Sequence, residues 1–424
     1  MKFQSTRGGG QPVTVSEAIQ NGLAPDGGLY IPTTLPSMDP GDFKGLDGDA
    51  EIARRLLEPF FKGDRLAGAL TEICEDTCGF DVPLREVDDQ TRVLELFWGP
   101  TAAFKDVGAA FLASSMQRLE EGAEQPLTIL VATSGDTGAA VAAAFDGRPG
   151  CEVVVLYPAG RVSDRQEALL TCWGDNVASF RVRGDFDDCQ RIVKEAFSDP
   201  WWRENRRLSS ANSINIGRLL PQMTYYASAS LRLWRESGEA PDFVVPTGNA
   251  GNVLACLYVR EMGLPVGRVV LATNENRPIP HYLKTGAWQA FETKKTLATA
   301  MDVGNPSNFE RILHHWQDVE ELREQIEVFQ VTDEEIRRTI EEGPRRWGQI
   351  WDPHTACAVV AREKIDSSKA VVVATAHPAK FPEVVEPLIG SEVPVPAPMK
   401  EMMERPRKVQ EIGPSLGELT ELVG

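Results

Sequence analysis

Leu127-Thr-Ile-Leu-Val-Ala-Thr-Ser-Gly-Asp-Thr-Gly138 is the stretch that decides the fold of this chain. It begins with a mainly apolar run, typical of a strand covered on both faces, and ends in a polar turn that leads into a helical pattern. The same order recurs from residue 93 onward, and this alternation predicts an α/β fold with parallel sheets. The expected strands are 93–98, 127–132, 152–157, 178–182, 242–245, 268–272 and 370–374, and the expected helices are 106–120, 138–146, 163–173, 186–198, 217–235 and 252–262.

Length and composition limit the class of protein. A chain of 424 residues is long for one core, so two or three domains are expected. Hydrophobic residues make up 42% and charged residues 25%, no apolar run is long enough to span a bilayer, and the start of the chain lacks the apolar segment of a signal peptide. The net charge of −18 argues against a nucleic-acid partner, because a phosphate backbone requires a basic surface.

The cysteines and histidines indicate neither a disulfide framework nor a metal site. The seven cysteines are an odd number without a Cys-x-x-Cys pair, and the five histidines form no metal-binding motif. We therefore expect reduced thiols, a cytoplasmic location and no bound metal. These patterns do not distinguish a monomer from a homodimer.

Three turns have the composition of anion-binding loops. In 133–138, hydroxyls and the free amides at a helix start suit a carboxylate or phosphate, although a capped turn with Thr137 as N-cap explains the pattern equally well. In 246–252, two glycines let backbone amides approach a phosphate, without matching a Walker or G-x-G-x-x-G motif. In 209–218, Arg218 can bind a phosphate or carboxylate, but a solvated arginine at a helix start is the preferred interpretation of that pattern alone.

Lys105 and Thr375 are further polar side chains at the ends of apolar runs. Lys105 begins a helical pattern shortly after the run 93–98, and burial there would favour the neutral, nucleophilic amine. An ordinary surface lysine is the preferred interpretation of that stretch by itself. Thr375 follows the run 370–374, at the edge of a parallel sheet where ligands bind, and the nearby His377 is more often structural than catalytic in such a place.

Two other parts of the chain carry less chemistry. Residues 1–90 predict a small, mostly helical unit that serves packing, with one helix over 50–61. Residues 273–350 combine loops with charged helical patterns over 319–329 and 333–347. We expect the latter region to be an exposed helical elaboration.

Six short stretches occur together in the order and approximate spacing of one known family. They are Asp26-Gly-Gly-Leu-Tyr30, Phe104-Lys-Asp106, Thr133-Ser-Gly-Asp-Thr-Gly138, Asn212-Ser-Ile-Asn215 with Arg218, Gly248-Asn-Ala-Gly-Asn252 and Thr375-Ala-His-Pro-Ala-Lys-Phe381. Each stretch is weak by itself, but the combination is highly specific and extends to about position 385. The chain thus resembles the threonine synthase family.

The resemblance implies a pyridoxal-phosphate enzyme of the tryptophan-synthase-β-like fold (fold type II), with two parallel-sheet α/β domains and a small N-terminal unit. It implies conversion of O-phospho-L-homoserine and water to L-threonine and phosphate by γ-elimination and β-addition of water, the last step of threonine biosynthesis. The expected ranges are 1–90 for the N-terminal unit, 91–125 with 220–400 for the larger cofactor-binding domain, 126–219 for the smaller substrate-gripping domain and 401–424 for a tail.

The resemblance also implies roles for individual residues. Lys105 matches the catalytic lysine that forms a Schiff base with the cofactor and acts as a base. The other implied cofactor contacts are Gly248, Asn249, Ala250, Gly251, Asn252, Thr375 and Asp136. The implied substrate contacts are Thr133, Ser134, Gly135 and Thr137 for the α-carboxylate, and Asn212, Ser213 and Arg218 for the phosphate.

Two positions depart from the pattern of the family and its relatives. Ala250 stands where many relatives have Phe, which alters ring packing but leaves the backbone amides free to bind phosphate. Asp136 stands where related enzymes of this fold often have Asn near the cofactor O3′, so its contact with the cofactor is open.

Two other functions are compatible with part of the pattern. A pyridoxal-phosphate-dependent dehydratase or phospho-lyase keeps the cofactor and changes the reaction, but a simple dehydratase has no substrate phosphate for the cluster 212–218 to hold. A non-catalytic phosphate-binding or cofactor-binding protein is disfavoured by Lys105, because binding a phosphate does not need that amine.

Overall fold

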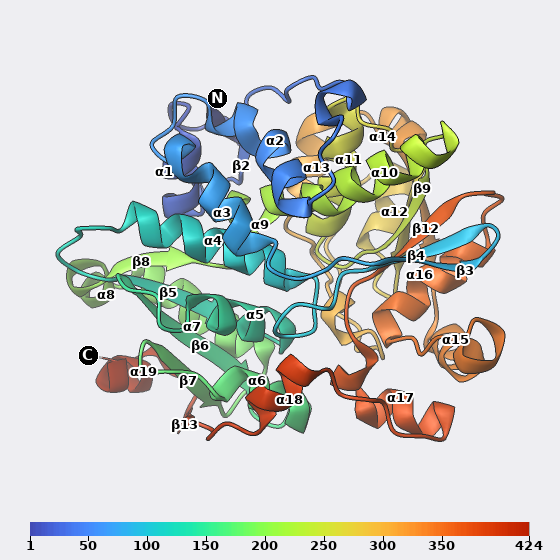
Figure 1. Ribbon diagram of the computed structural model, residues 1–424. Coiled ribbons are helices and arrows are strands. Elements are labelled where there is room, and N and C mark those ends of the chain that lie inside the picture. The colour runs from blue at the N-terminus through green and yellow to red at the C-terminus, as the bar shows by residue number, and fades with distance from the viewer. Residues whose placement is uncertain (424) are drawn as a thin grey trace.

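Two mainly parallel sheets organise the protein in this computed structural model, which describes residues 1–423 (Figure 1). The larger sheet has the strand order β11-β10-β9-β12-β4-β3, and the smaller has the order β13-β7-β6-β5-β8. Every neighbouring pair is parallel except β3 with β4. The antiparallel pair β1 (Phe3–Ser5) and β2 (Tyr30–Pro32) belongs to the N-terminal unit. The predicted α/β architecture is confirmed.

The larger sheet is buried at its centre. Its strands are β3 (Leu84–Asp88), β4 (Thr91–Glu95), β9 (Asp242–Pro246), β10 (Val269–Thr273), β11 (Ile326–Gln330) and β12 (Ala370–Ala374). Every residue of β9, β10 and β12 is buried, because helices such as α16 (Pro353–Glu363) and α11 (Gly251–Glu261) pack on these strands. The continuous apolar runs in the sequence reflect this cover on both faces.

The smaller sheet divides two hydrophobic cores. It is formed by β5 (Leu127–Ala132), β6 (Cys151–Pro158), β7 (Val177–Val182), β8 (Arg207–Ser210) and β13 (Gln410–Ile412). On β5, Ile129 and Val131 pack in the main core, whereas Leu130 and Ala132 pack in a second core with Cys189 and its neighbours on α7 (Phe186–Ser198). This alternation follows from the two-residue period of a strand.

Helices connect these strands and cover the sheets. In the smaller unit they are α5 (Asp136–Phe145), α6 (Asp164–Thr171), α7 and α8 (Pro200–Asn205). Towards the larger sheet the chain forms α9 (Ile216–Leu219), η3 (Leu220–Gln222) and α10 (Met223–Ser237). The N-terminal unit contains α1 (Val15–Asn21), η1 (Pro40–Phe43), α2 (Asp49–Phe61), η2 (Ala67–Ala69) and α3 (Leu70–Thr77). Its helices α1 and α3 pack on α4 (Lys105–Leu119), and α2 packs on α10, so this unit is mostly helical, as predicted.

The predicted helix over 319–329 is wrong in its second half. The chain forms α14 (Val319–Gln325) and then β11, which pairs with β10 in parallel register. The pairing decides this conformation, because Ile326 is buried beside Val269 whereas the charged pattern of the segment is helical in isolation. The rest of 273–350 forms α12 (Pro278–Thr285), η4 (Thr299–Met301), α13 (Phe309–His315) and α15 (Asp333–Arg346).

The C-terminal segment crosses from the larger to the smaller unit (Figure 1). After β12 it forms η5 (Pro378–Lys380), α17 (Pro382–Ile389), α18 (Ala397–Met403), β13 and α19 (Leu416–Val423). The strand β13 pairs with β7, and the Trp202 Nε1 donates to the Thr420 Oγ1 at 2.9 Å. Residues 401–424 were expected to be a tail, but the described part of this range extends the smaller sheet.

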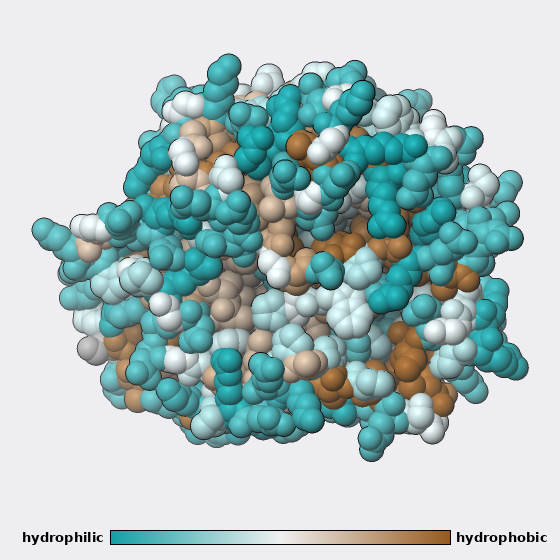
Figure 2. Space-filling model, viewed as in Figure 1, coloured by the Kyte–Doolittle hydropathy of each residue, from teal (hydrophilic) through white to brown (hydrophobic). Residues whose placement is uncertain are grey.

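The surface is mainly hydrophilic on the face shown in Figure 2, and its hydrophobic residues form small patches. None of the helices in the described part of the chain has the length and apolar character needed to cross a membrane.

Candidate active site

Lys105 lies where the ends of β4 and β12 meet. The loop before α4 runs beside the end of β12, because the Phe104 amide donates to the Thr375 carbonyl at 2.9 Å and the His377 amide donates to the Ala102 carbonyl at 3.0 Å. Lys105 is the first residue of α4, and its side chain is 15% exposed. The backbone therefore places Lys105 and Thr375 at the same edge of the larger sheet, where parallel sheets bind ligands.

The amine of Lys105 faces a buried carboxylate from the other unit. Its Nζ lies 3.5 Å from the Oδ2 of Asp136, the first residue of α5. The other carboxylate oxygen of Asp136 lies 2.8 Å from the Nζ of Lys380, which is fully buried. Burial lowers the pKa of Lys105, Asp136 opposes that shift, and Lys380 adds to it. The interpretation of Lys105 as an ordinary surface lysine is therefore wrong.

Asp136 is held as an anion by these two lysines. Burial alone would raise the pKa of Asp136, but the charges of Lys380 and Lys105 attract the carboxylate and hold its pKa well below the usual range. Gln166 Nε2 also donates to the Oδ1 of Asp136 at 3.3 Å. Lys380 was not predicted as a site residue, and the only sign of it was its place in the polar stretch after the last buried strand.

The hydroxyl of Thr133 holds the turn 133–138 in its conformation. The Thr133 Oγ1 accepts hydrogen bonds from the amides of Gly135 at 3.0 Å and Gly138 at 2.9 Å. Gly135 has φ +136°, and a Cβ there would lie 2.8 Å from Gln166 Nε2, so only glycine fits. Gly135 is also the N-cap of α5, so the alternative with Thr137 as N-cap is wrong. Thr137 is partly buried and Ser134 is exposed, which leaves both hydroxyls available to a ligand.

The loop 248–252 between β9 and α11 forms a narrow cradle. Ala250, the N-cap of α11, has φ +62°, which turns the backbone into the left-handed region. A Cβ on Gly248 would lie 2.7 Å from Met301 Cα, and a Cβ on Gly251 would lie 3.2 Å from Asn308 Nδ2. The free amides at the start of α11 and this close packing suit a phosphate group.

A second polar turn faces this cradle. The Asn249 Nδ2 donates to the Ser213 Oγ at 2.5 Å, which joins the two turns. Arg218 is only 2% exposed and donates to the Ala211 carbonyl at 2.6 Å, so the interpretation as a solvated helix-start arginine is wrong. Burial lowers the pKa of Arg218 to about 10.

Three buried polar atoms of the predicted residues have no partner within the described protein. They are Arg218 Nε, Asn212 Oδ1 and Asn252 Nδ2. A buried polar atom without a partner costs about 1–3 kcal/mol, so such atoms point to a polar ligand.

The region 273–350 supplies a support for these turns that sequence reasoning missed. The Ser307 amide donates to the Asn249 Oδ1 at 2.6 Å, and the Asn308 amide donates to the Asn249 carbonyl at 3.3 Å. Asn308 Nδ2 also donates to the Ser213 carbonyl at 3.3 Å. This part of the region is therefore no exposed elaboration. The only sign of this support in the sequence was the polar loop 304–308, which matches no recognised motif.

Arg311 ties the same turns to the N-terminal unit. It is fully buried, and its Nη2 donates to the Ile214 carbonyl at 2.6 Å while its Nε donates to the Tyr30 carbonyl at 3.0 Å. Its Nη1 also donates to Asn308 Oδ1. The N-terminal unit, expected to serve packing only, thus reaches the backbone of the candidate site.

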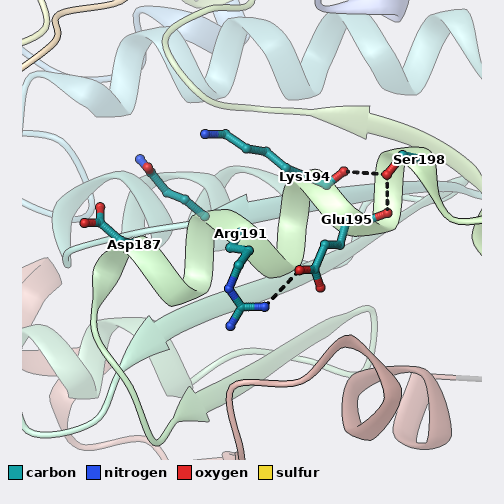
Figure 3. Close-up of a pocket in the computed structure, with 6 residues that line it drawn as sticks. Asp187, Arg191, Lys194, Glu195 and Ser198 are labelled. Atoms are coloured by element: carbon teal, nitrogen blue, oxygen red, sulfur yellow. Dashed lines mark hydrogen bonds and ion pairs between the residues drawn. The ribbon is translucent and has the colours of Figure 1, made fainter. Parts of the chain in front are cut away.

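An open hollow of about 390 Å³ lies along α7, away from every predicted site residue (Figure 3). It is lined by Asp187, Gln190, Arg191, Lys194, Glu195 and Ser198. The charge of Arg191 is already matched by Glu195 and Asp188, both at 2.9 Å. None of the described residues that line this hollow has a buried, unpaired polar atom like those of Arg218, Asn212 and Asn252.

Comparisons with known proteins agree with this geometry. The family of pyridoxal-phosphate dependent enzymes matches residues 94–376, the threonine synthase N terminus matches 2–78 and the threonine synthase C-terminal family matches 355–423. The threonine synthase of Serratia marcescens is 39% identical over 424 residues, which cover 99% of this chain and 98% of that protein. The chain belongs to the threonine synthase family.

Other members of this family show the same extent of similarity to the chain. The threonine synthase of Escherichia coli K12 is 38% identical over 411 residues, covering 96% of this chain and 94% of the relative. The crystal structure of pyridoxal-phosphate-bound threonine synthase from Brucella melitensis has a TM-score of 0.94 and 36% identity, covering 100% of this chain and 98% of that one. Similarity over nearly the whole of each chain includes both sheets and the N-terminal unit.

The enzyme is a lyase with pyridoxal 5′-phosphate as its cofactor. The site fits this group on its own geometry. The cradle 248–252 has the close packing and free amides that suit a phosphate, the buried Asn252 Nδ2 lacks a partner within the described protein, and Lys105 presents an amine with a lowered pKa. A lysine of lowered pKa is what a covalent bond to an aldehyde requires.

Proposed function

We propose that this protein converts O-phospho-L-homoserine and water to L-threonine and phosphate, with Lys105 as the residue that anchors the cofactor and then moves protons. The observation that supports the substrate best is the pair of polar turns joined by Asn249 and Ser213. Two neighbouring anion sites suit one phosphate of the cofactor and one of the substrate. A dehydratase acting on a simple hydroxy-amino acid needs only the first.

Pyridoxal phosphate, when bound, supplies a conjugated ring that accepts the electron pair left behind when a proton leaves the substrate Cα. The Lys105 amine takes that proton, because burial favours its neutral form and it lies at the mouth of α4. Thr375 offers a neutral hydroxyl, and no carboxylate, to the ring nitrogen. The loop 248–252 holds the cofactor phosphate through backbone amides, so Ala250 is tolerated there.

The remaining residues orient the substrate. The exposed hydroxyl of Ser134 and the free amides at the start of α5 bind the α-carboxylate, and Thr137 borders the same turn. Asn212, Ser213 and Arg218 hold the substrate phosphate and stabilise its charge as it departs. The Arg218 Nε, which is buried and has no hydrogen-bond partner within the described protein, is the donor that such a contact would satisfy. The domain ranges and a direct contact of Thr133 or Asp136 with a ligand stay predictions.

One experiment separates this function from its nearest alternative. The purified protein with pyridoxal phosphate is incubated with O-phospho-L-homoserine, and L-threonine, 2-oxobutyrate and phosphate are measured. Threonine and phosphate in equal amounts support the proposal. If 2-oxobutyrate forms instead, the enzyme is a phospho-lyase. L-Threonine as a control substrate reveals dehydratase activity, which would give 2-oxobutyrate without phosphate.

A cytoplasmic location is also part of this proposal. All seven cysteines are free, and six of them are buried, which suits a reducing compartment. The mass of the purified protein under native conditions would decide between a monomer and a homodimer.

A further inference from the structure

Among the described residues, Lys380 is the one buried lysine near the candidate site whose role is open. It ends η5, which follows β12, and its side chain has no exposed surface. Its Nζ donates to the Thr101 carbonyl at 2.8 Å and lies 2.8 Å from the Asp136 Oδ1. These partners come from the loop before α4 and from α5, so one ammonium joins three segments around Lys105.

A buried charge needs a reason, because taking an ammonium out of water is costly even when it is paired. Replacing only one partner of a buried ion pair leaves the other charge unpaired and is destabilising, so the contact with Asp136 at 2.8 Å is one reason to keep a charged side chain here. The position of the charge gives a more specific reason. Asp136 turns Oδ1 to Lys380 and Oδ2 to Lys105 Nζ, 3.5 Å away, so the orientation of its carboxylate depends on both lysines.

The other ionisable groups around this cluster do not replace Lys380. His354 Nε2 accepts from the Ala300 amide at 3.0 Å and its Nδ1 lies 2.7 Å from the Asp352 Oδ1, so both ring nitrogens have partners other than Asp136. His377 Nδ1 accepts from the Ala379 amide at 3.1 Å, and burial lowers the pKa of His377 to about 4.

Two further groups face the cluster from other sides. Arg218 faces Lys105 and disfavours its protonation, and no hydrogen bond joins it to Asp136 in the described structure. Asp106 is buried and accepts from the amide of Thr101 at 2.9 Å. Lys380 therefore remains the closest fixed cation to Asp136.

We propose that Lys380 is a positioning residue for Lys105: its buried ammonium fixes Asp136 as an anion in one orientation and thereby sets the place and the proton affinity of the Lys105 nitrogen. The proposal rests on the proposed role of Lys105 as the anchor of the cofactor. It assigns a function to the lysine of the stretch 375–381, and it gives Asp136 a task at the nitrogen of Lys105 in addition to any contact with the cofactor.

The two charges act on Lys105 with opposite signs. Removal of the Lys380 cation leaves the Asp136 anion unbalanced, so the anion attracts a proton on the Lys105 nitrogen more strongly and that proton is lost at a higher pH. Removal of the Asp136 anion has the opposite effect, because the nitrogen is left beside a cation alone. Opposite shifts from the two neighbours are a result that loss of packing would not produce.

The test is a pH titration of the absorbance of the bound cofactor, without substrate, in the holoenzyme and three variants. This absorbance reports the proton on the Lys105 nitrogen, so it is independent of turnover. Lys380→Met should raise the midpoint by about one pH unit or more, and Asp136→Asn should lower it. Lys364→Met, which removes an exposed ion pair with Glu335, is the matched control and should leave the midpoint unchanged.

The outcomes separate this proposal from the proposed function. An unchanged midpoint in folded, cofactor-loaded Lys380→Met, or shifts of the same sign in both site variants, would overturn it even if threonine is formed. A wild-type enzyme that forms no threonine leaves the titration valid, because no substrate is present. If Lys380→Met does not fold, Lys380→Gln is used with the same expected rise. Failure of both to fold, while Asp136→Asn folds and binds cofactor, would make Lys380 a requirement of folding and refute the proposal.

Discussion

Replacing Arg218 by alanine tests whether the turn 212–218 holds the substrate phosphate. The guanidinium is 2% exposed, one of its nitrogens donates to the Ala211 carbonyl, and its Nε has no partner within the described protein. The side chain therefore has a free donor in a place where water is largely excluded. A phosphate bound there would receive charge-assisted hydrogen bonds, which are stronger than neutral ones.

The expected cost follows from this burial. Removing one partner of a buried, hydrogen-bonded charge pair costs about 2–5 kcal/mol, which corresponds to a loss of roughly 30-fold to several thousand-fold in kcat/KM at about 1.4 kcal/mol per tenfold. The lost bond to Ala211 should lower the stability of the fold by about 1 kcal/mol, so the assay is run well below the unfolding temperature. Arg218→Lys keeps the charge and loses the forked geometry, so it should lie between the wild type and alanine.

The assay compares ligands that differ only in the phosphate. Steady-state kinetics with O-phospho-L-homoserine give kcat/KM, and inorganic phosphate is tested as an inhibitor. L-Homoserine, which lacks the phosphate, is titrated against the absorbance of the bound cofactor. Arg218→Ala should lower kcat/KM for O-phospho-L-homoserine and weaken inhibition by inorganic phosphate. Binding of L-homoserine and the absorbance of the cofactor should stay close to wild type. Unchanged kcat/KM, or an equal loss with L-homoserine, would refute the assignment of Arg218 to the phosphate.

Three other changes test separate parts of the structure. Lys105→Ala should abolish activity and the absorbance of covalently held cofactor; a yellow, active variant would contradict the role of Lys105. Gly248→Val should lower cofactor affinity at least tenfold by equilibrium titration, because even a Cβ would lie 2.7 Å from Met301 Cα, whereas Gly68→Ala, with open space around it, should bind normally. Burial lowers the pKa of His315 to about 4 from 6.5, so the stability due to its neutral ring is lost as the pH falls through this window. In His315→Gln, the urea concentration at the unfolding midpoint should fall less between pH 6.5 and about 4 than in the wild type. The same pH dependence in both proteins would contradict the lowered pKa of His315.

Local pattern predicted the central elements well. The strands β5 and β12 and the helix α7 have the predicted bounds, because a continuous apolar run or a strong helical period is visible within the segment itself. The strands β8 and β13 were missed, since both are short and become strands only by pairing with β5 and β7. The same reason explains β11, whose sequence is helical by local pattern but whose pairing with β10 decides otherwise.

Some residues of the candidate site could likewise be predicted from local pattern, and others could not. The turns 133–138 and 248–252 could be singled out from the sequence, because glycines and hydroxyls that follow an apolar run are visible in the local pattern, but only the resemblance assigned ligands to them. Arg218 was expected at the surface by its own pattern, and only the fold buries it. Asn308 and Arg311 had no motif, because most of their partners are backbone carbonyls, which any sequence provides.

The sequence by itself determined the order of buried strands and polar turns, and with the resemblance it determined the family and the cofactor. The reason is that strand period, helix period and turn chemistry are local properties of neighbouring residues. Only the tertiary structure decided that Lys105, Asp136 and Lys380 lie together, since they come from α4, α5 and η5. The charge on a buried group depends on what packs beside it, and that is decided by contacts between segments far apart in the chain.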